Sequence, residues 1–441
     1  MSKTTLNHGF IEKTFTSMRF NGFMVDDSPS INQPLHVIYG GANLFTAGTT
    51  KKLGEIALRS IETNAPSAGD FATIFGLSDT IAEKAFEKVR TRLQVCPIED
   101  LRIDFEDGFG IRPDAEEDEH AVRAAIETAK AMEANALPPF FGIRVKSFSA
   151  VTYKRALRTL DLYLTRLIDA AHGLPQNFVV TLPKVESLIE TKLLADILNE
   201  FESIKGLENG LIKIEIMVET PQALLDDKGV CPLPSIIDAA RGRCRGAHFG
   251  AYDYMASLGI ASTSQELTHQ SCDNARNIMQ LALSRKDIWL SDGATNTMPV
   301  GPHRGNELST EQITANRDAV SSGWIKHFNN CKQSLHNGFP QGWDLHPAQI
   351  PARLAAVYQY YLENLDESAK RLKNFVKQAT HASLVGTAFD DAATGQGLLN
   401  YFNGALNSGA IDENELLSLT GLTSDAVRSR SFNAILDMKR S

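Results

Sequence analysis

Eight short apolar segments recur along the 441-residue chain, and stretches with helical spacing separate nearly all of them. In the clearest of them, Ile214, Ile216 and Val218 alternate with other residues before Glu219-Thr-Pro221 ends the run. β-Branched residues at a spacing of two are typical of a strand, and proline cannot continue a hydrogen-bonded ladder. The eight expected strands are residues 35–39, 101–105, 140–146, 177–184, 211–219, 245–250, 287–290 and 342–347.

Strands that alternate with helices in this way are parallel and are joined by crossover helices. Eight of them predict a closed (β/α)8 barrel. An open doubly wound sheet is the alternative, but no Gly-x-Gly-x-x-Gly motif follows the first strand. We expect an N-terminal extension over residues 1–34, the barrel over residues 35–350, and a helical C-terminal extension over residues 351–441. This last part would pack on the barrel or reach a neighbouring subunit.

The composition narrows the class of protein. A hydrophobic share of 43% is enough for a large core, while a net charge of −9 argues against nonspecific binding of nucleic acid. No apolar stretch approaches the ~20 residues of a membrane span, and the first ten residues do not resemble a signal peptide. The five cysteines contain no Cys-x-x-Cys pair, so neither a zinc site nor a disulfide framework is indicated. We therefore expect a cytoplasmic protein with reduced thiols and no contact with nucleic acid or membrane.

In a barrel of this kind the carboxyl ends of the strands meet at one mouth, where active sites lie. Polar side chains stand at or just after most of the expected strand ends. They are Asp104, Glu106, Asp107, Arg144, Lys146, Lys184, Glu186, Glu219, Asp253, Asp292 and His346. The sequence therefore predicts a mouth in which a few basic groups are flanked by several carboxylates.

Glu219 and Asp253 stand at the tips of two adjacent expected strands. Hard carboxylate oxygens suit Mg²⁺ better than zinc, with Mn²⁺ as an alternative ion. Each carboxylate could instead pair with a nearby arginine or lysine. The matching positions on neighbouring strands favour a metal site.

Arg144 lies inside an expected strand, between Ile143 and Val145. A guanidinium group is costly to bury unless it holds an anion, and its planar fork fits a carboxylate. That anion could belong to a substrate, or it could be Asp104 or Glu106 in a structural ion pair, and one side chain could serve both purposes. A single histidine such as His346 is more often a structural hydrogen-bonding group than a base, so we expect it to support the site.

Six motifs occur in the order of a known family and span most of residues 35–350. They are Asp104-Phe-Glu-Asp-Gly108, Gly142-Ile-Arg-Val145, Leu182-Pro-Lys-Val-Glu186, Val218-Glu-Thr220, Phe249-Gly-Ala-Tyr-Asp253 and His346-Pro-Ala-Gln-Ile350. Together they resemble the citrate lyase β-subunit-like branch of the HpcH/HpaI aldolase superfamily, which also contains malyl-CoA lyases.

The resemblance implies a barrel of the phosphoenolpyruvate/pyruvate type in which Glu219 and Asp253 hold Mg²⁺. It implies that Arg144 grips the 2-oxo acid or enolate end of a substrate. Gly40-Gly41 resembles the family's first-strand glycine turn, and we expect both glycines to bind the substrate. It also implies a trimer or hexamer in which an aspartate from a neighbouring subunit acts as acid and base. Asp391 matches that aspartate best, and Asp390 is the alternative.

The chain departs from the family at the first strand, where Pro34-Leu-His36 lacks the basic residue used near coenzyme A. The loop Thr295–Asn306 is also long. Both departures disfavour a coenzyme A thioester as the substrate.

The function that we expect is a Mg²⁺-dependent carbon–carbon lyase of the aldol or Claisen type. It would act on a 2-oxo or hydroxy acid through an enolate-like intermediate, and release or use pyruvate, glyoxylate or an acetyl unit. Five side chains would support the site, namely Asp104, Glu106, Asp107, Lys184 and His346.

Two alternatives stay open. One is phosphoryl transfer or hydrolysis of a phosphoenolpyruvate-like ligand, with His303-Arg304 as a phosphate contact. The other is a barrel that binds an oxo acid without catalysis.

Overall fold

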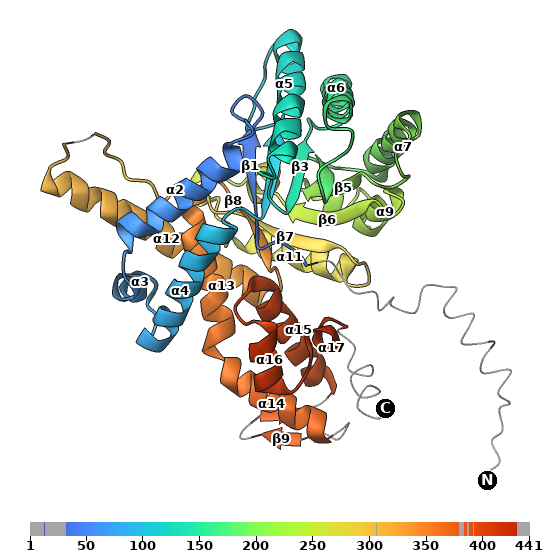
Figure 1. The fold of residues 1–441 in the computed structure, drawn as a ribbon. Helices are drawn as coiled ribbons and strands as arrows, with labels where there is room; N and C mark the ends of the chain where they lie inside the picture. Colours follow the sequence, from blue (N-terminus) through green and yellow to red (C-terminus); the bar gives the residue numbers. More distant parts are fainter. Residues whose placement is uncertain are drawn as a thin grey trace. The chain divides into compact units, whose positions relative to one another are not determined.

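A computed structural model of the protein describes residues 13, 32–305, 307–378, 383–385, 388–390 and 392–429. Eight strands form one closed barrel in chain order, and parallel pairing of β8 with β1 completes the ring (Figure 1). The strands are β1 (His36–Gly41), β2 (Asp100–Asp104), β3 (Phe140–Arg144), β4 (Phe178–Leu182), β5 (Lys213–Val218), β6 (Cys244–Phe249), β7 (Trp289–Ala294) and β8 (Gln341–Asp344). The predicted (β/α)8 barrel is confirmed, and the open-sheet alternative is wrong.

Helices surround the strands in the order that the sequence predicts (Figure 1). They are α2 (Thr49–Asn64), α3 (Ala68–Phe75), α4 (Asp79–Val95), α5 (Asp114–Glu133), α6 (Tyr153–Ala171), α7 (Leu188–Lys205), α8 (Pro221–Leu224), α9 (Leu233–Ala239), α10 (Ala251–Ser257), α11 (Gln270–Leu283), α12 (Thr310–His336) and α13 (Ile350–Glu363). Short 3-10 turns, η1 (Ser262–Ser264) and η2 (Pro347–Gln349), complete the connections. Among the residues described, no helix is long and apolar enough to cross a membrane.

Local sequence explains where these helices begin and which face they bury. Helix α7 begins at a capping box, because Ser187 and Glu190 satisfy each other's backbone amides. In α6, Leu160, Leu164 and Leu167 recur at helical spacing and are buried. Each such leucine contributes about 1.5–3 kcal/mol when it leaves water. The amphipathic helices therefore cover the outside of the barrel.

The inside of the barrel is unusually rich in charge. Arg102 on β2 is completely buried, pairs with Asp100, and lies 2.7 Å from the carboxylate of Glu215 on β5. Glu215 also binds Arg245 at 2.9 Å and His248 at 3.2 Å, both from β6. Strand residues two apart face the same side, so Asp100 and Arg102 lie below Asp104 at the mouth. This ion cluster fills the barrel beneath the mouth.

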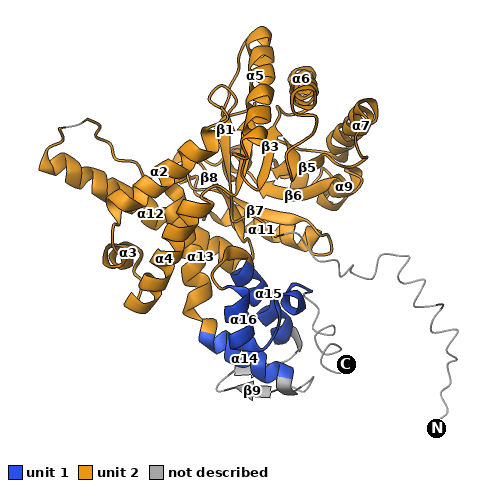
Figure 2. Ribbon diagram, viewed as in Figure 1, with its two compact units in different colours: residues 1–31, 366–406, 412–441 blue, residues 32–365, 407–411 orange. Residues whose placement is uncertain are grey.

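The chain divides into two compact units (Figure 2). The barrel unit comprises residues 32–365 and 407–411. The sequence analysis placed the end of the barrel at residue 350. In the structure the barrel unit continues to Leu365, because α13 packs against α12 and α4.

The other unit comprises residues 1–31, 366–406 and 412–441. Its described elements are α14 (Leu365–Gln378), the antiparallel pair β9 (Ser383–Val385) and β10 (Ala388–Asp390), α15 (Ala392–Ser408), α16 (Glu413–Thr420) and α17 (Ser424–Arg428). Gly395 allows close packing here, since a Cβ at that position would lie 2.4 Å from the Phe375 ring.

Candidate active site

Asp104, at the end of β2, holds Arg144, at the end of β3, in a bidentate ion pair. Oδ1 of Asp104 accepts from Nε of Arg144 at 2.7 Å, and Oδ2 accepts from Nη2 at 2.5 Å. The same carboxylate accepts the backbone amides of Glu106 at 2.9 Å and Gly108 at 2.7 Å. Both side chains of the pair are buried. Asp104 is therefore fully engaged, and it fixes the plane of the guanidinium group.

The third nitrogen of that guanidinium group is not saturated. Nη1 of Arg144 is buried and makes no hydrogen bond, although Oε2 of Glu106 lies 3.2 Å away. The rings of Tyr39 and Trp343 lie against one side of the group, with centroids 4.8 and 5.4 Å from Cζ and 4.5 Å from each other. Two of the three nitrogens are thus hydrogen-bonded to Asp104, while the third is ion-paired with Glu106 and Asp107 and makes no hydrogen bond. Of the alternatives that the sequence left open for Arg144, the structural ion pair is present, and it does not use the whole group.

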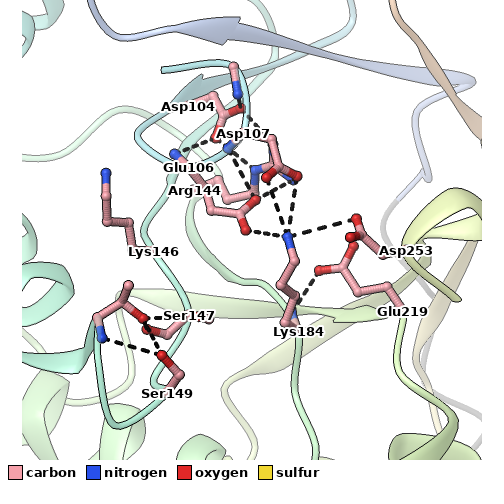
Figure 3. Close-up of polar contacts among 12 residues, drawn as sticks. Asp104, Glu106, Asp107, Arg144, Lys146, Ser147, Ser149, Lys184, Glu219 and Asp253 are labelled. Atoms are coloured by element: carbon pink, nitrogen blue, oxygen red, sulfur yellow. Dashed lines mark hydrogen bonds and ion pairs between the residues drawn. The ribbon is translucent and has the colours of Figure 1, made fainter. Parts of the chain in front are cut away.

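Lys184 lies at the centre of the remaining carboxylates (Figure 3). Its ammonium group pairs with Glu106 and lies 3.3 Å from Asp107 and 3.7 Å from Asp253. Burial lowers the pKa of Lys184, but the carboxylates of Glu219 and Glu106 outweigh this effect and raise it well above its usual value. Lys184 therefore stays charged and links the loop after β2 to the loop after β6.

Glu219, directly after β5, is almost completely buried. Its Oε1 accepts the backbone amide of Lys184 at 2.7 Å. Burial raises the pKa of Glu219 to about 8, against the opposing charges of Lys184 and Arg144. So high a pKa means that the surrounding positive charges do not fully stabilise the ionised carboxylate. A cation that reaches Glu219 would therefore be bound favourably.

Asp253, on the first turn of α10 after β6, is half-exposed and its carboxylate lies beside that of Glu219 (Figure 3). Among the residues described, no cluster of three or more acidic, histidine or cysteine side chains is arranged to hold a metal ion. Two carboxylates are nevertheless sufficient for Mg²⁺, which keeps several waters and commonly binds one or two carboxylates plus substrate oxygens. The oxygen donors of Glu219 and Asp253 fit that ion.

A pocket of about 280 Å³ opens next to this pair. Its lining is polar, and its residues are Ser147, Ser149, Lys184, Glu186, Glu190, Glu219, Thr220, Asp253 and Ser257. Lys184 is the one cation in that lining. Four carboxylates share that lining with Lys184, so the pocket suits a small polar ligand that binds together with a cation better than a large apolar one.

Some strand-end residues lie elsewhere than the sequence suggested. Lys146 turns away from the mouth to α5, where its ammonium group lies 2.8 Å from Glu117. Asp292 faces outward and binds Arg276 on α11 at 3.0 Å, because alternate residues of β7 point to opposite sides. His346 caps η2 by accepting the amide of Ala348 at 3.1 Å, and burial lowers its pKa.

The two glycines of the first strand differ. A Cβ on Gly41 would lie 2.3 Å from the carbonyl oxygen of Gly108, so this glycine lets β1 approach the loop after β2. Gly40 has open space around it and lies on the face of β1 opposite to Tyr39. Asp390 ends β10, and Asp391 lies outside the described residues.

A family model covers nearly the whole chain. It matches residues 24–435 and is described as a domain of unknown function, DUF6986. The chain belongs to this family. No curated protein matches the sequence.

Solved structures similar to this family member include three enzymes or enzyme subunits. A citrate lyase from Burkholderia xenovorans has a TM-score of 0.57 at 16% identity, over 90% of this chain and 98% of the other. This likeness shows that the two share a fold. The CitE protein of Mycobacterium tuberculosis, in complex with magnesium, acetoacetate and coenzyme A, has a TM-score of 0.46 at 16% identity, over 84% and 97% of the two chains. Malate synthase of Haloferax volcanii has a TM-score of 0.46 at 14% identity, over 92% and 98%.

The sequence analysis did not identify several residues of the site. Tyr39 and Trp343, which pack against Arg144, lie on strands β1 and β8 and carry no motif of their own. The serines of the pocket, Ser147 and Ser149, belong to the loop after β3. Their position directly after a strand end is the signal that could have identified them, because the loops at that end of a barrel form the mouth.

Proposed function

We propose that this protein is a Mg²⁺-dependent carbon–carbon lyase that acts on a small 2-oxo or hydroxy acid. The observation that carries the proposal is the juxtaposition at one mouth of a buried arginine, whose Nη1 makes no hydrogen bond, and two adjacent carboxylates, Glu219 and Asp253. The shared fold with a citrate lyase and the six family motifs support the same class of reaction.

Arg144 binds the carboxylate or the developing oxyanion of the substrate through Nη1. Its other two nitrogens are held by Asp104, so the donor is fixed in direction before the substrate arrives. A preorganised donor of this kind costs no reorganisation during the reaction and stabilises the charge that forms in the transition state. The rings of Tyr39 and Trp343 lie 4.5 Å apart and together shield one side of the group from water.

Glu219 and Asp253 hold the metal ion. When bound, Mg²⁺ supplies Lewis-acid stabilisation of negative charge on the carboxylate and carbonyl oxygens of the substrate. Lys184 orients Glu219 through its backbone amide and carries a positive charge next to Asp253. The buried position of Glu219 keeps bulk water from competing for the site.

A proton must also move when the carbon–carbon bond forms or breaks, and we assign this step to Asp391 of a second copy of the chain. Exposed aliphatic side chains in the segments that follow several strands support assembly over the mouth. They are Leu44, Ile111, Val151, Ile189, Leu225, Val230 and Leu258. Ile111 is fully exposed in the single chain. A second copy that covered this rim would bury apolar area and could bring an acid to the site.

The test is a panel of 2-oxo and hydroxy acids assayed for release of pyruvate or glyoxylate, with Mg²⁺ and with EDTA. We expect product formation that requires Mg²⁺ and that is lost in Glu219→Gln and Asp253→Asn. Lys192→Gln, a change in an exposed ion pair on α7, serves as the control. If Glu219→Gln retains Mg²⁺-dependent turnover, the ligand assignment fails. If acids bind without any product, the protein is a binding barrel.

A further inference from the structure

The position of Lys184 suggests more than a supporting role. Its ammonium group is within ion-pair distance of three carboxylates, from Glu106, Asp107 and Asp253. Its backbone amide binds the fourth, Glu219. A single residue from the loop after β4 thus contacts both carboxylates of the proposed metal pair, one through its backbone and one through its side chain.

The backbone of Lys184 is held in a conformation that side chains rarely adopt, with φ of 51°. Left-handed geometry is uncommon for a residue with a long side chain and costs free energy. The conformation directs the amide to Glu219 while the side chain reaches toward Asp107 and Asp253 (Figure 3).

An ammonium group so placed competes with a divalent cation. Like charges repel strongly at distances of a few ångströms in a partly buried site, and the Lys184 nitrogen is 3.7 Å from Asp253. A metal ion that takes Glu219 and Asp253 must share their charge with Lys184. At the same time Lys184 is part of the pocket lining and is about one-third exposed. It is therefore available to an anionic ligand that enters beside the metal.

We propose that Lys184 acts as a resident counter-ion, which weakens the binding of Mg²⁺ to the empty site and strengthens the binding of the anionic substrate to the metal-loaded site. This inference rests on the metal pair of the proposed function. It adds that the Lys184 side chain opposes the binding of Mg²⁺ and favours the binding of the anionic substrate. The metal-free protein keeps its carboxylates in place through Lys184, and the ammonium group serves the substrate once the metal binds Glu219 and Asp253.

The experiment measures two affinities by isothermal titration calorimetry. Mg²⁺ alone is titrated first, and pyruvate or glyoxylate is then titrated at saturating Mg²⁺. We expect Lys184→Gln to bind Mg²⁺ more tightly and the oxo acid more weakly, each by about 5- to 150-fold, the usual range of couplings between sites. Lys184→Arg keeps the charge and should stay close to wild type, as should the surface control Lys192→Gln. Circular dichroism checks that each variant is folded.

Opposite shifts are the signature of the proposed role, because a residue that only maintains the shape of the site would weaken both ligands when removed. A parallel loss of both affinities in Lys184→Gln, or no change in either, overturns the inference while leaving the lyase proposal intact. Opposite shifts without product formation overturn the lyase proposal alone. If the wild-type protein binds no Mg²⁺, both fail.

Discussion

Gly250 leaves room for Glu219. A Cβ on Gly250, at the end of β6, would lie 2.4 Å from both Cβ and Oε2 of Glu219 on the neighbouring strand. Real Cβ atoms do not approach so closely, and Glu219 is also fixed by the amide of Lys184. The absence of a side chain at position 250 therefore decides where the buried carboxylate can lie.

Gly250→Ala should displace Glu219 and weaken Mg²⁺ binding by about 10- to 100-fold, the usual cost of disturbing residues that orient a metal ligand. The measurement is calorimetric titration with Mg²⁺. Gly173→Ala is the matched control, because a Cβ there has open space around it. Equal Mg²⁺ affinity in the two variants would show that Glu219 is not a ligand.

Arg144→Lys should reduce kcat by about 10²- to 10³-fold, as the loss of one preorganised donor does in other enzymes. A lysine cannot both form the bidentate pair with Asp104 and offer a separate donor. Steady-state kinetics on the substrate found in the acid panel provide the test. Arg158→Lys, which changes an exposed arginine on α6 that pairs with Asp118, should leave kcat unchanged. A wild-type kcat in Arg144→Lys would mean that Arg144 serves only the fold.

Mg²⁺ should stabilise the folded protein, because it binds the native site and not the unfolded chain. At a concentration 100 times its Kd the expected gain is about 2.7 kcal/mol in the free energy of unfolding. Thermal denaturation with Mg²⁺ and with EDTA measures this gain. Glu219→Gln should show no difference between the two conditions. If Mg²⁺ still stabilises Glu219→Gln against thermal denaturation, the stabilising ion binds at another site.

If Asp391 is supplied by a second subunit, an intact Asp391 on a different chain should restore activity to a site that lacks its own. Arg144→Gln and Asp391→Asn should each be inactive alone, while mixed oligomers of the two should regain activity, since some mouths then combine an intact Arg144 with an intact Asp391. Activity after mixing, dissociation and reassembly is the measurement, and light scattering reports the oligomeric state. A fully active monomer would contradict the assignment.

His327 on α12 should make stability depend on pH. Burial lowers the pKa of His327, but Cys331 and Asp344 outweigh burial and raise it to about 9, from 6.5 in the unfolded chain. A raised pKa means that the folded protein holds the proton more tightly. The stabilisation is complete below about pH 6.5 and is lost as the pH rises through about 9.

Urea unfolding at pH 6 and pH 9.5 tests this expectation. The wild type should lose up to about 3 kcal/mol more between the two values than His327→Gln does. The variant should be less stable at pH 6, because Asp344 loses one of its partners and keeps Arg353. Parallel pH profiles for the two proteins would show that the pKa of His327 is the same in the folded and unfolded states.

The sequence was enough to predict the barrel and the carboxylates at its mouth. The reason is that strand periodicity, proline at strand ends and the order of polar tips are local properties. Glu219 and Asp253 could be placed just beyond the ends of neighbouring strands from chain order alone, because consecutive parallel strands in a barrel are adjacent. The helical spacing between the strands is a local signal of the same kind.

Only the tertiary structure decided how those charges are shared. Which side of a strand a residue faces depends on where the strand begins, and this sends Asp292 outward to Arg276 while Glu219 stays inside. The pairing of Asp104 with two nitrogens of Arg144, which leaves the third without a hydrogen bond, depends on contacts across strands. The position of Lys184 between the carboxylates of the loop after β2 and that of Asp253 on α10 is likewise a long-range property. The sequence thus determined which chemical groups stand near the strand ends, and the closure of the barrel decided which of them face the mouth and remain available to a metal ion and a substrate.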